Sequence, residues 1–256
     1  MDRTGIITGA AGGVGRATAE RFARDGWSLV LTDVTEGVPA LAEAIGAGAA
    51  GRVVGVRADL SDPAGVAAIG EAFESLGRPL AFLGLVAGTL QKVVALEALD
   101  MDEWDRVMAV NLRANVLMIK HFIPMLRRAG GASIVTVSSW FGHSGHGMFG
   151  AYCASKAGLI SLTQSAAAEL AVDRIRVNSV APGNIATAMH LTALRQEADQ
   201  RGTSFEAIKR SEWDKIPLGR AAEPSEIAAA IAFLASPDSA YITGATIDVN
   251  GGVLFA

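Results

Sequence analysis

The sequence contains a single cysteine, Cys153, among its 256 residues. One cysteine excludes an internal disulfide and a thiolate zinc cluster, and the four histidines show no metal-ligand spacing, so we expect no metal site. Scarce cysteine fits a reducing compartment, and the residues after Met1 lack the apolar stretch of a signal peptide. These absences favour a cytoplasmic protein.

Strong charge patches and long apolar runs are also absent. The net charge is only -4, and Lys and Arg gather in no more than pairs, which gives nucleic acid no electrostatic surface to bind. The longest charge-free stretch, 129–155, is interrupted by Gly, Ser and His, so it cannot supply the roughly 20 mainly apolar residues of a membrane helix. We therefore expect neither nucleic acid nor a membrane as a partner.

What the sequence does contain is a regular alternation of apolar runs and helical patterns. Half of the residues are hydrophobic, enough for a large core. The short runs are nearly continuous in Val, Ile and Leu, as in strands of a parallel sheet that helices cover on both faces. The sequence therefore predicts an α/β protein: one domain over residues 1–256, with a doubly wound, seven-stranded parallel sheet.

The predicted strands are 5–8, 28–33, 52–58, 80–87, 132–138, 176–181 and 246–249. The predicted helices are 15–25, 38–46, 63–76, 101–128, 151–172 and 224–235. A further helical segment near 193–213 is rich in charge and interrupts the alternation of strand and helix. We expect residues at about 187–216 to form a lid over a substrate.

A glycine-rich turn connects the first predicted strand to the first helix. It contains Gly9, Gly13, Val14 and Gly15. At such a helix N-terminus, backbone N–H groups and the helix dipole favour a pyrophosphate. A glycine string alone also fits a plain backbone turn, but the strand, turn and helix in succession favour a Rossmann fold that binds a dinucleotide.

Asp33 ends the second predicted strand, about 20 residues after the glycine turn. A carboxylate there accepts hydrogen bonds from the adenosine ribose and repels a 2′-phosphate. The alternative is a solvated Asp at a strand end. The spacing, and the absence of a basic residue at Val34 and Thr35, favour NAD over NADP as the cofactor.

Three residues form a candidate catalytic set. Tyr152 and Lys156 stand four apart at the start of a predicted helix and so share one face. An ammonium lowers the pKa of a nearby phenol, so Tyr152 is expected to take a proton from a substrate hydroxyl during hydride transfer. Ser139 closes the fifth predicted strand at its carboxyl end, where open α/β sheets bind ligands. Alone, a Tyr and a Lys at this spacing are also common on helix surfaces.

Taken together, these motifs resemble the short-chain dehydrogenase/reductase family over essentially the whole chain. The matching positions are Thr8, Gly9, Gly13 and Gly15 of TGxxxGxG, Tyr152 and Lys156 of YxxxK, the family serine at Ser139, and Asn111. The resemblance implies an NAD-preferring enzyme with Asn111, Ser139, Tyr152 and Lys156 as its catalytic residues. For Asn111 it implies support of a water chain to the lysine; the alternative is a local hydrogen bond within its helix.

The resemblance also implies the cofactor contacts. These fall at Gly9, Gly13, Val14, Gly15, Asp33, Asp59, Leu60, Ala87, Gly88, Tyr152, Lys156, Pro182, Gly183, Ile185 and Thr187. Asp59 otherwise fits a cap of the next helix. Gly12 replaces the basic residue typical of NADP users, in agreement with Asp33. One departure stands out, because Leu85 and Val86 occupy the place of an Asn pair.

The substrate is less defined. Phe141, His146 and Asn184 are expected to line its pocket, although each also fits loop polarity or core packing. The resemblance points to oxidation of a secondary alcohol such as a polyol, sugar or cyclic diol, and to a homotetramer that uses helices 101–128 and 151–172 and the tail 253–256. The alternatives are an NADPH-dependent carbonyl or 3-oxoacyl reductase, and a non-enzymatic nucleotide-binding protein, which has no need of the four catalytic residues.

Overall fold

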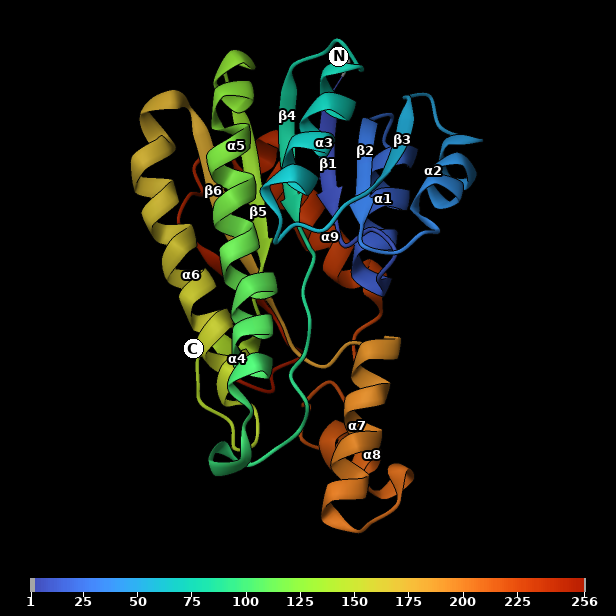
Figure 1. Cartoon of the computed structure of the whole chain (residues 1–256), viewed down its shortest axis with the longest axis vertical. Helices are drawn as coiled ribbons and strands as arrows, with labels where there is room; N and C mark the ends of the chain where they lie inside the picture. Colours follow the sequence, from blue (N-terminus) through green and yellow to red (C-terminus); the bar gives the residue numbers. More distant parts are fainter. Residues whose placement is uncertain (1–2, 256) are drawn as a thin grey trace.

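A seven-stranded parallel sheet forms the centre of the computed structural model, which describes residues 3–255 (Figure 1). The strand order is β3-β2-β1-β4-β5-β6-β7. The strands are β1 (Thr4–Thr8), β2 (Ser28–Asp33), β3 (Val53–Arg57), β4 (Leu80–Leu85), β5 (Ala132–Val137), β6 (Ile175–Pro182) and β7 (Thr246–Val249). The order reverses between β1 and β4, where such sheets bind ligands at their carboxyl ends. The predicted α/β fold is confirmed.

The end of β4 differs from the prediction. The strand stops at Leu85 rather than at residue 87. The backbone N–H groups of Val86 and Ala87 donate instead to Oγ1 of Thr8, at 3.0 and 3.1 Å. The hydroxyl of Thr8 thus takes the place of the backbone acceptors of a neighbouring strand. The chain therefore leaves the sheet after Leu85.

Helices cover both faces of the sheet. On one face, α1 (Gly13–Arg24), α2 (Val38–Gly46) and α9 (Pro224–Ala235) bury an apolar core against the strands. On the other face lie α3 (Pro63–Glu74), α5 (Ala114–Arg128) and α6 (Gly150–Leu170), in front of the sheet in Figure 1. The inner strands β1, β2 and β5 are almost fully buried, which explains why their sequences are mainly apolar on both sides.

The helix predicted over 101–128 is present, but its hydrogen-bond pattern changes in the middle. It consists of α4 (Met101–Met108), a π-helical turn (Ala109–Arg113) and α5. Within this turn, the carbonyl oxygen of Asn111 accepts a hydrogen bond of 2.8 Å from the side chain of Asn115. A side chain that bonds into the backbone ladder in this way widens the helix locally. The turn therefore sets the position of Asn111.

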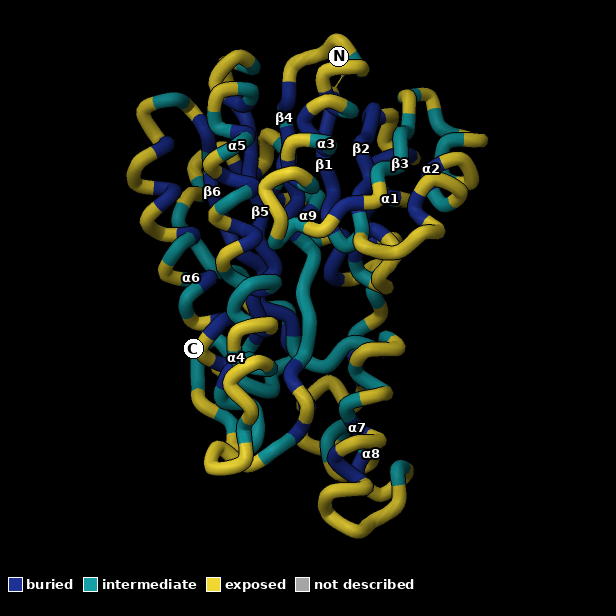
Figure 2. The backbone as a smooth tube through the Cα atoms, viewed as in Figure 1, coloured by how far each residue is buried: buried dark blue, intermediate teal, exposed yellow. Residues whose placement is uncertain are grey.

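The predicted segment 193–213 is two helices rather than one. These are α7 (Ala188–Arg201) and α8 (Phe205–Trp213). Gly202, with φ of +61°, ends α7. The two helices lie below the main body in Figure 1 and are largely exposed in Figure 2, apart from a small core of their own. That core consists of Leu194, Ala198 and Ile208, with Leu191 and Phe205 packed on it.

Two expectations from the sequence concern the absence of a membrane-spanning helix and the burial of the C-terminal tail. None of the helices within residues 3–255 is long and apolar enough to cross a membrane. Of the tail 253–256, Ala256 lies outside the described residues, and Phe255 is exposed.

Candidate active site

The glycine loop between β1 and α1 leaves no room for side chains. Gly9 has a φ of +66°, and a Cβ there would lie 2.7 Å from the Cα of Ala87. A Cβ at Gly15 would lie 2.0 Å from the carbonyl oxygen of Gly9, so α1 packs directly on the loop. Gly12 precedes α1, and no side chain caps the helix there. Backbone N–H groups of the first turn are therefore available to a pyrophosphate.

Asp33 stands at the end of β2, beside this loop. Its Oδ2 accepts a hydrogen bond from the N–H of Ala11 at 3.0 Å, and its Oδ1 accepts one from the N–H of Thr35 at 3.2 Å. Both bonds hold the carboxylate at the edge of the cleft that the glycine loop lines. This is where the ribose of a dinucleotide on the loop is expected to lie.

Asp59 follows β3 at the same edge of the sheet. Its Oδ1 accepts a hydrogen bond from the N–H of Ser61 at 2.8 Å. The alternative interpretation, in which Asp59 caps the next helix, is wrong: Asp62 is the cap of α3. Asp33, Asp59 and Leu60 line one pocket, which fits the adenosine end of a dinucleotide.

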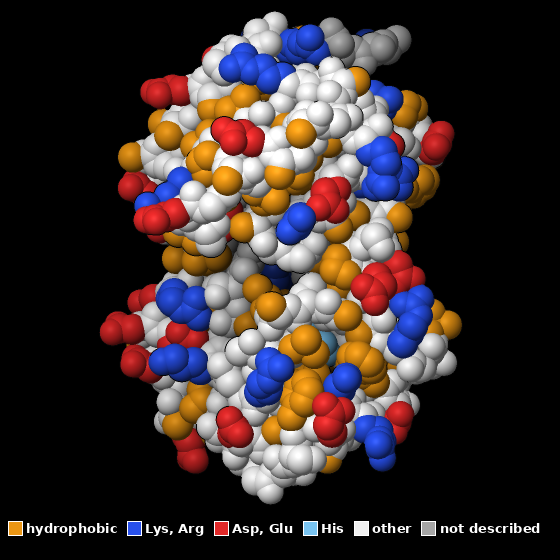
Figure 3. Space-filling view, turned by 90° about the vertical axis from the view of Figure 1, so that its right-hand side faces the viewer, with side chains coloured by type: hydrophobic (Ala, Val, Ile, Leu, Met, Phe, Trp, Pro, Cys, Tyr) orange, Lys and Arg blue, Asp and Glu red, His pale blue; other side chains and the backbone are white. Residues whose placement is uncertain are grey.

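A cleft runs from the glycine loop to the ends of β4, β5 and β6. Figure 3 shows a hollow between the main body and the lobe below it, which is formed by α7 and α8. The lining includes these predicted cofactor residues: Gly9, Gly13, Val14, Gly15, Asp33, Ala87, Gly88, Tyr152, Lys156, Pro182, Gly183, Ile185 and Thr187. Val86 lies in the wall where the family has an Asn. Because a Cβ at Gly88 would lie 3.2 Å from Nζ of Lys156, glycine keeps this wall open.

Ser139, Tyr152 and Lys156 meet at the inner end of the cleft. Ser139 follows β5 and is 7% exposed, while Lys156 lies one turn after Tyr152 in α6 and is 4% exposed. Nζ of Lys156 donates a hydrogen bond of 2.8 Å to the carbonyl oxygen of Val137 and lies 5.6 Å from the centre of the Tyr152 ring. The ammonium is thus fixed beside the phenol by the end of β5.

The acidity of the phenol differs from the sequence expectation. Burial raises the pKa of Tyr152 to about 12, and a hydrogen bond with Ser139 opposes this rise. Burial also lowers the pKa of Lys156 to about 8. The predicted lowering of the Tyr152 pKa is therefore not seen in the protein alone, because loss of water around the phenolate outweighs the hydrogen bond with Ser139.

Asn111 is fully buried and connects three parts of the site. Its Oδ1 accepts a hydrogen bond of 2.8 Å from the N–H of Thr89, and its Nδ2 donates to the carbonyl oxygen of Thr89 at 2.9 Å. Nδ2 also donates to Oγ of Ser155 in α6 at 3.0 Å. The side chain thus bonds to distant segments, not locally within its helix.

A second cavity, of about 150 Å³, adjoins the cleft. Ser139 and Tyr152 line both spaces, so the cavity opens on two of the residues predicted to be catalytic. Phe141 and Asn184 line it, as expected for a substrate pocket. The apolar side chains in its wall are those of Leu90, Trp140, Phe149, Ile185, Met189, Ala193 and Leu194.

His146 is not among the residues that line this cavity. Its ring stacks on Phe141, with 3.8 Å between ring centres and 11° between planes. Its Nε2 lies 3.1 Å from Oγ of Ser144. His146 therefore supports Phe141 from behind.

Three polar residues of the lobe line the cavity, and no sequence motif selects them: His190, Glu197 and Glu212. Nε1 of Trp213 donates a hydrogen bond of 3.4 Å to Nε2 of His190. Burial lowers the pKa of His190, with Glu212 acting in the opposite direction. The charge-rich composition of 193–213 is a signal for Glu197 and Glu212, but it does not tell which charges point inward, and His190 lies outside that segment.

A dinucleotide cleft that ends at a serine, a tyrosine and a lysine defines a nucleotide-dependent oxidoreductase site. A family profile described as enoyl-(acyl carrier protein) reductase matches residues 9–254. The chain belongs to the short-chain dehydrogenase/reductase family, as the sequence motifs predicted.

Relatives of known activity span the whole length of the chain. Cis-4-hydroxycyclohexanecarboxylate dehydrogenase of Sinomonas cyclohexanicum is 38% identical over 251 residues, which cover 98% of this chain and 96% of the relative. Among solved structures, levodione reductase matches with a TM-score of 0.92 and 33% identity over 98% of this chain and 97% of its own. A 3-ketoacyl-(acyl-carrier-protein) reductase from Brucella melitensis, complexed with NADH, matches with a TM-score of 0.87 and 32% identity over 98% of each chain.

Proposed function

We propose that this protein is an NAD-dependent dehydrogenase that interconverts a secondary alcohol on a small neutral ring and the corresponding ketone. One observation carries the proposal: Ser139 and Tyr152 line both the dinucleotide cleft and the adjoining cavity. A bound nicotinamide dinucleotide supplies the acceptor or the donor of the hydride. A substrate held in the cavity would therefore lie beside Ser139 and Tyr152 and next to the cleft whose residues would hold the nicotinamide dinucleotide.

The chain's own residues handle the proton. During oxidation, Tyr152 accepts the proton of the substrate hydroxyl, and during reduction the phenol returns it to the ketone oxygen. Oγ of Ser139 holds the same substrate oxygen by a hydrogen bond. Lys156, fixed by Val137, stabilises the phenolate form of the tyrosine.

The choice of NAD rests on Asp33. Its carboxylate is held at the rim of the cleft by the N–H groups of Ala11 and Thr35, where it accepts hydrogen bonds from ribose hydroxyls and repels a 2′-phosphate.

Asp33→Asn is expected to narrow the preference for NAD over NADP, measured as the ratio of kcat/KM values, by about tenfold or more, since it removes a like charge facing the phosphate. Asp238→Asn, which changes an exposed Asp outside the cleft, is the matched control and should leave the ratio unchanged. If the unmutated protein itself preferred NADP, the proposal would be contradicted.

The cavity favours a neutral ring over an acid or an acyl thioester. None of the described residues that line it is Lys or Arg, whereas Glu197 and Glu212 are both present. Arg201 and Lys215 pair with these two acids, so the cations are already occupied. An anionic substrate group would lose water here without gaining a free cation, which is costly. Ring alcohols with a second neutral oxygen fit the lining better.

His190 is the group expected to recognise that second oxygen. Since its Nε2 accepts the Trp213 hydrogen bond, the neutral ring carries its proton on Nδ1 and can donate it. For a cyclohexane diol with para hydroxyls, His190→Ala should raise KM about five- to tenfold, the value of one hydrogen bond. For cyclohexanol, which lacks the second oxygen, KM should stay unchanged. Steady-state kinetics with both alcohols test this, and an equal change for both would contradict the assignment.

Turnover assays with a panel of alcohols, ketones and 3-oxoacyl thioesters, each with NAD(H) and NADP(H), separate the alternatives. Faster turnover of a 3-oxoacyl thioester with NADPH would favour the reductase alternative. Absence of turnover with every alcohol and ketone, despite tight NADH binding, would favour a non-enzymatic nucleotide-binding role.

A further inference from the structure

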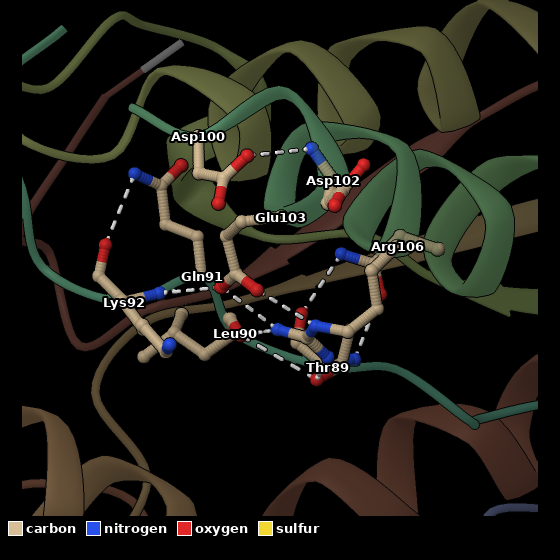
Figure 4. Close-up of polar contacts among 9 residues, drawn as sticks. Thr89, Leu90, Gln91, Lys92, Asp100, Asp102, Glu103 and Arg106 are labelled. Carbon is tan, nitrogen blue, oxygen red and sulfur yellow. Dashed lines mark hydrogen bonds and ion pairs between the residues drawn. The ribbon is translucent and has the colours of Figure 1, made fainter. Parts of the chain in front are cut away.

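A short segment after Gly88, residues 89–92, crosses between α4 and the start of α6, and we name it the 89–92 strap. Figure 4 shows its polar contacts with α4. Gln91, at its centre, is only 2% exposed. Its Oε1 accepts a hydrogen bond of 2.9 Å from the backbone N–H of Tyr152, and its Nε2 donates one of 2.8 Å to the carbonyl oxygen of Met148. Both ends of one buried amide are therefore used at the entry to α6.

The first of these bonds compensates for a missing cap. α6 begins at Gly150, and the preceding Phe149 offers no side-chain hydrogen bond to the helix. The N–H groups of a first helical turn have no partner within the helix and need one from elsewhere. Gln91 supplies that partner to Tyr152, the residue whose side chain handles the proton. A bond to any other residue of the turn would not fix the tyrosine so directly.

The second bond holds the turn before the helix. Met148 has a φ of +70°, a conformation that residues other than glycine rarely adopt. Its carbonyl oxygen accepts hydrogen bonds from Nε2 of Gln91 and from the N–H of Val94, the latter at 3.3 Å. Such a conformation persists only where its surroundings enforce it. Gln91 thus also fixes the direction from which the chain enters α6.

The strap is itself fastened to α4. Oε1 of Glu103 accepts a hydrogen bond of 2.8 Å from the N–H of Lys92. Arg106 donates to Oγ1 of Thr89 at 2.7 Å and to the carbonyl oxygen of Leu90 at 2.9 Å, and it pairs with Glu103 at 2.8 Å (Figure 4). The ion pair holds the pKa of Glu103 at about 2, so the anchor stays charged over the working pH range. Gln91 therefore has a rigid base.

We propose that Gln91 is a positioning residue for the reaction, which holds the backbone of Tyr152 so that the phenol stays beside Ser139. This inference rests on the proposed function for its effect on turnover, but not for the hydrogen bond itself. The side chain of Gln91 does not line the cofactor cleft or the substrate cavity, so its effect should fall on kcat rather than on KM.

Gln91→Met tests the proposal, because Met fills a similar volume but makes neither hydrogen bond. We expect kcat to fall about 10- to 100-fold, the usual effect of a small misplacement of a reacting group, with the KM for NAD and alcohol unchanged. The amide of Tyr152 should also exchange its hydrogen with solvent at least about tenfold faster, as measured by hydrogen-exchange mass spectrometry.

Two further variants separate positioning from general loss of structure. Gln91→Glu keeps an oxygen for the N–H of Tyr152 and should recover part of kcat relative to Gln91→Met. Gln200→Met changes an exposed glutamine of α7 in the same way and should leave kcat and exchange unaltered. Thermal melting of each variant shows whether the protein is folded at the assay temperature.

Each possible result of these experiments either supports or refutes the role of Gln91 as a positioning residue. Faster exchange with unchanged kcat would reduce Gln91 to a structural role, and unchanged exchange would overturn the proposal altogether. If the natural protein oxidised no alcohol, the proposed function would fail on its own, while unchanged exchange in Gln91→Met would still refute the hold on Tyr152 independently.

Discussion

Tyr152→Phe is expected to lower kcat about a thousandfold, a typical loss when a positioned acid or base is removed. The change deletes only the phenolic oxygen. The ring retains its edge-to-face contact with Phe141, at 6.0 Å between centres, so the cavity keeps its shape. NADH binding, followed by fluorescence titration, should therefore remain close to that of the natural protein. Steady-state kinetics in both directions measure the loss.

The chain offers a matched control for this variant. Tyr241 is the only other tyrosine, and it is fully exposed. Tyr241→Phe makes the same chemical change away from the site and should leave kcat unaltered. Retained turnover in Tyr152→Phe would refute the assigned proton transfer. Parallel loss of NADH binding would instead show that the variant disturbs the cleft.

Lys156→Met is expected to slow alcohol oxidation about a hundredfold at neutral pH and to shift its pH profile upward. Burial already raises the pKa of Tyr152 to about 12. Nζ of Lys156 lies 5.6 Å from the centre of the Tyr152 ring, where its positive charge is expected to favour the phenolate. Removing this charge raises the phenol pKa further. At any given pH less phenolate is then available, so oxidation requires more alkaline solution. Reduction uses the protonated phenol and should lose less.

Lys156→Met also leaves the buried carbonyl oxygen of Val137 without its hydrogen bond, which costs about 1–3 kcal/mol of unfolding free energy. Rates should therefore be compared well below the melting temperature of the variant. Lys120→Met removes an exposed lysine of α5 and serves as the control. An unchanged pH profile in Lys156→Met would contradict its role toward Tyr152.

Much of the fold was predictable because parallel strands are buried on both faces. The strands β2 and β5 are rich in Leu, Val and Ile and are buried along nearly their whole length, and the predicted and observed strands agree within one or two residues. The π-helical turn around Asn111 was not predictable, because it depends on a side-chain bond from Asn115 that a helical sequence pattern does not reveal. Nor did the pattern show that Gly202 divides the lobe into two helices.

The residues of the candidate site also divide into those that the sequence predicts and those that it does not. Short motifs indicate residues whose chemistry and spacing are linked along the chain, such as Tyr152 and Lys156, and the structure brings these to one cleft. Residues that act through tertiary contacts leave no such pattern. Gln91 reaches Tyr152 across 61 positions of sequence, and His190 faces the cavity only because of how α7 lies on the main body.

The lobe formed by α7 and α8 carries its own small core of Leu194, Ala198 and Ile208. His190, Glu197 and Glu212, the polar side chains that set this cavity apart, all come from or adjoin that lobe. Mutations that alter them leave the sheet and the proton-transfer residues untouched. During evolution, such a chain can therefore acquire a new substrate through mutations in α7 and α8 alone, while the residues of its redox site and its sheet stay the same.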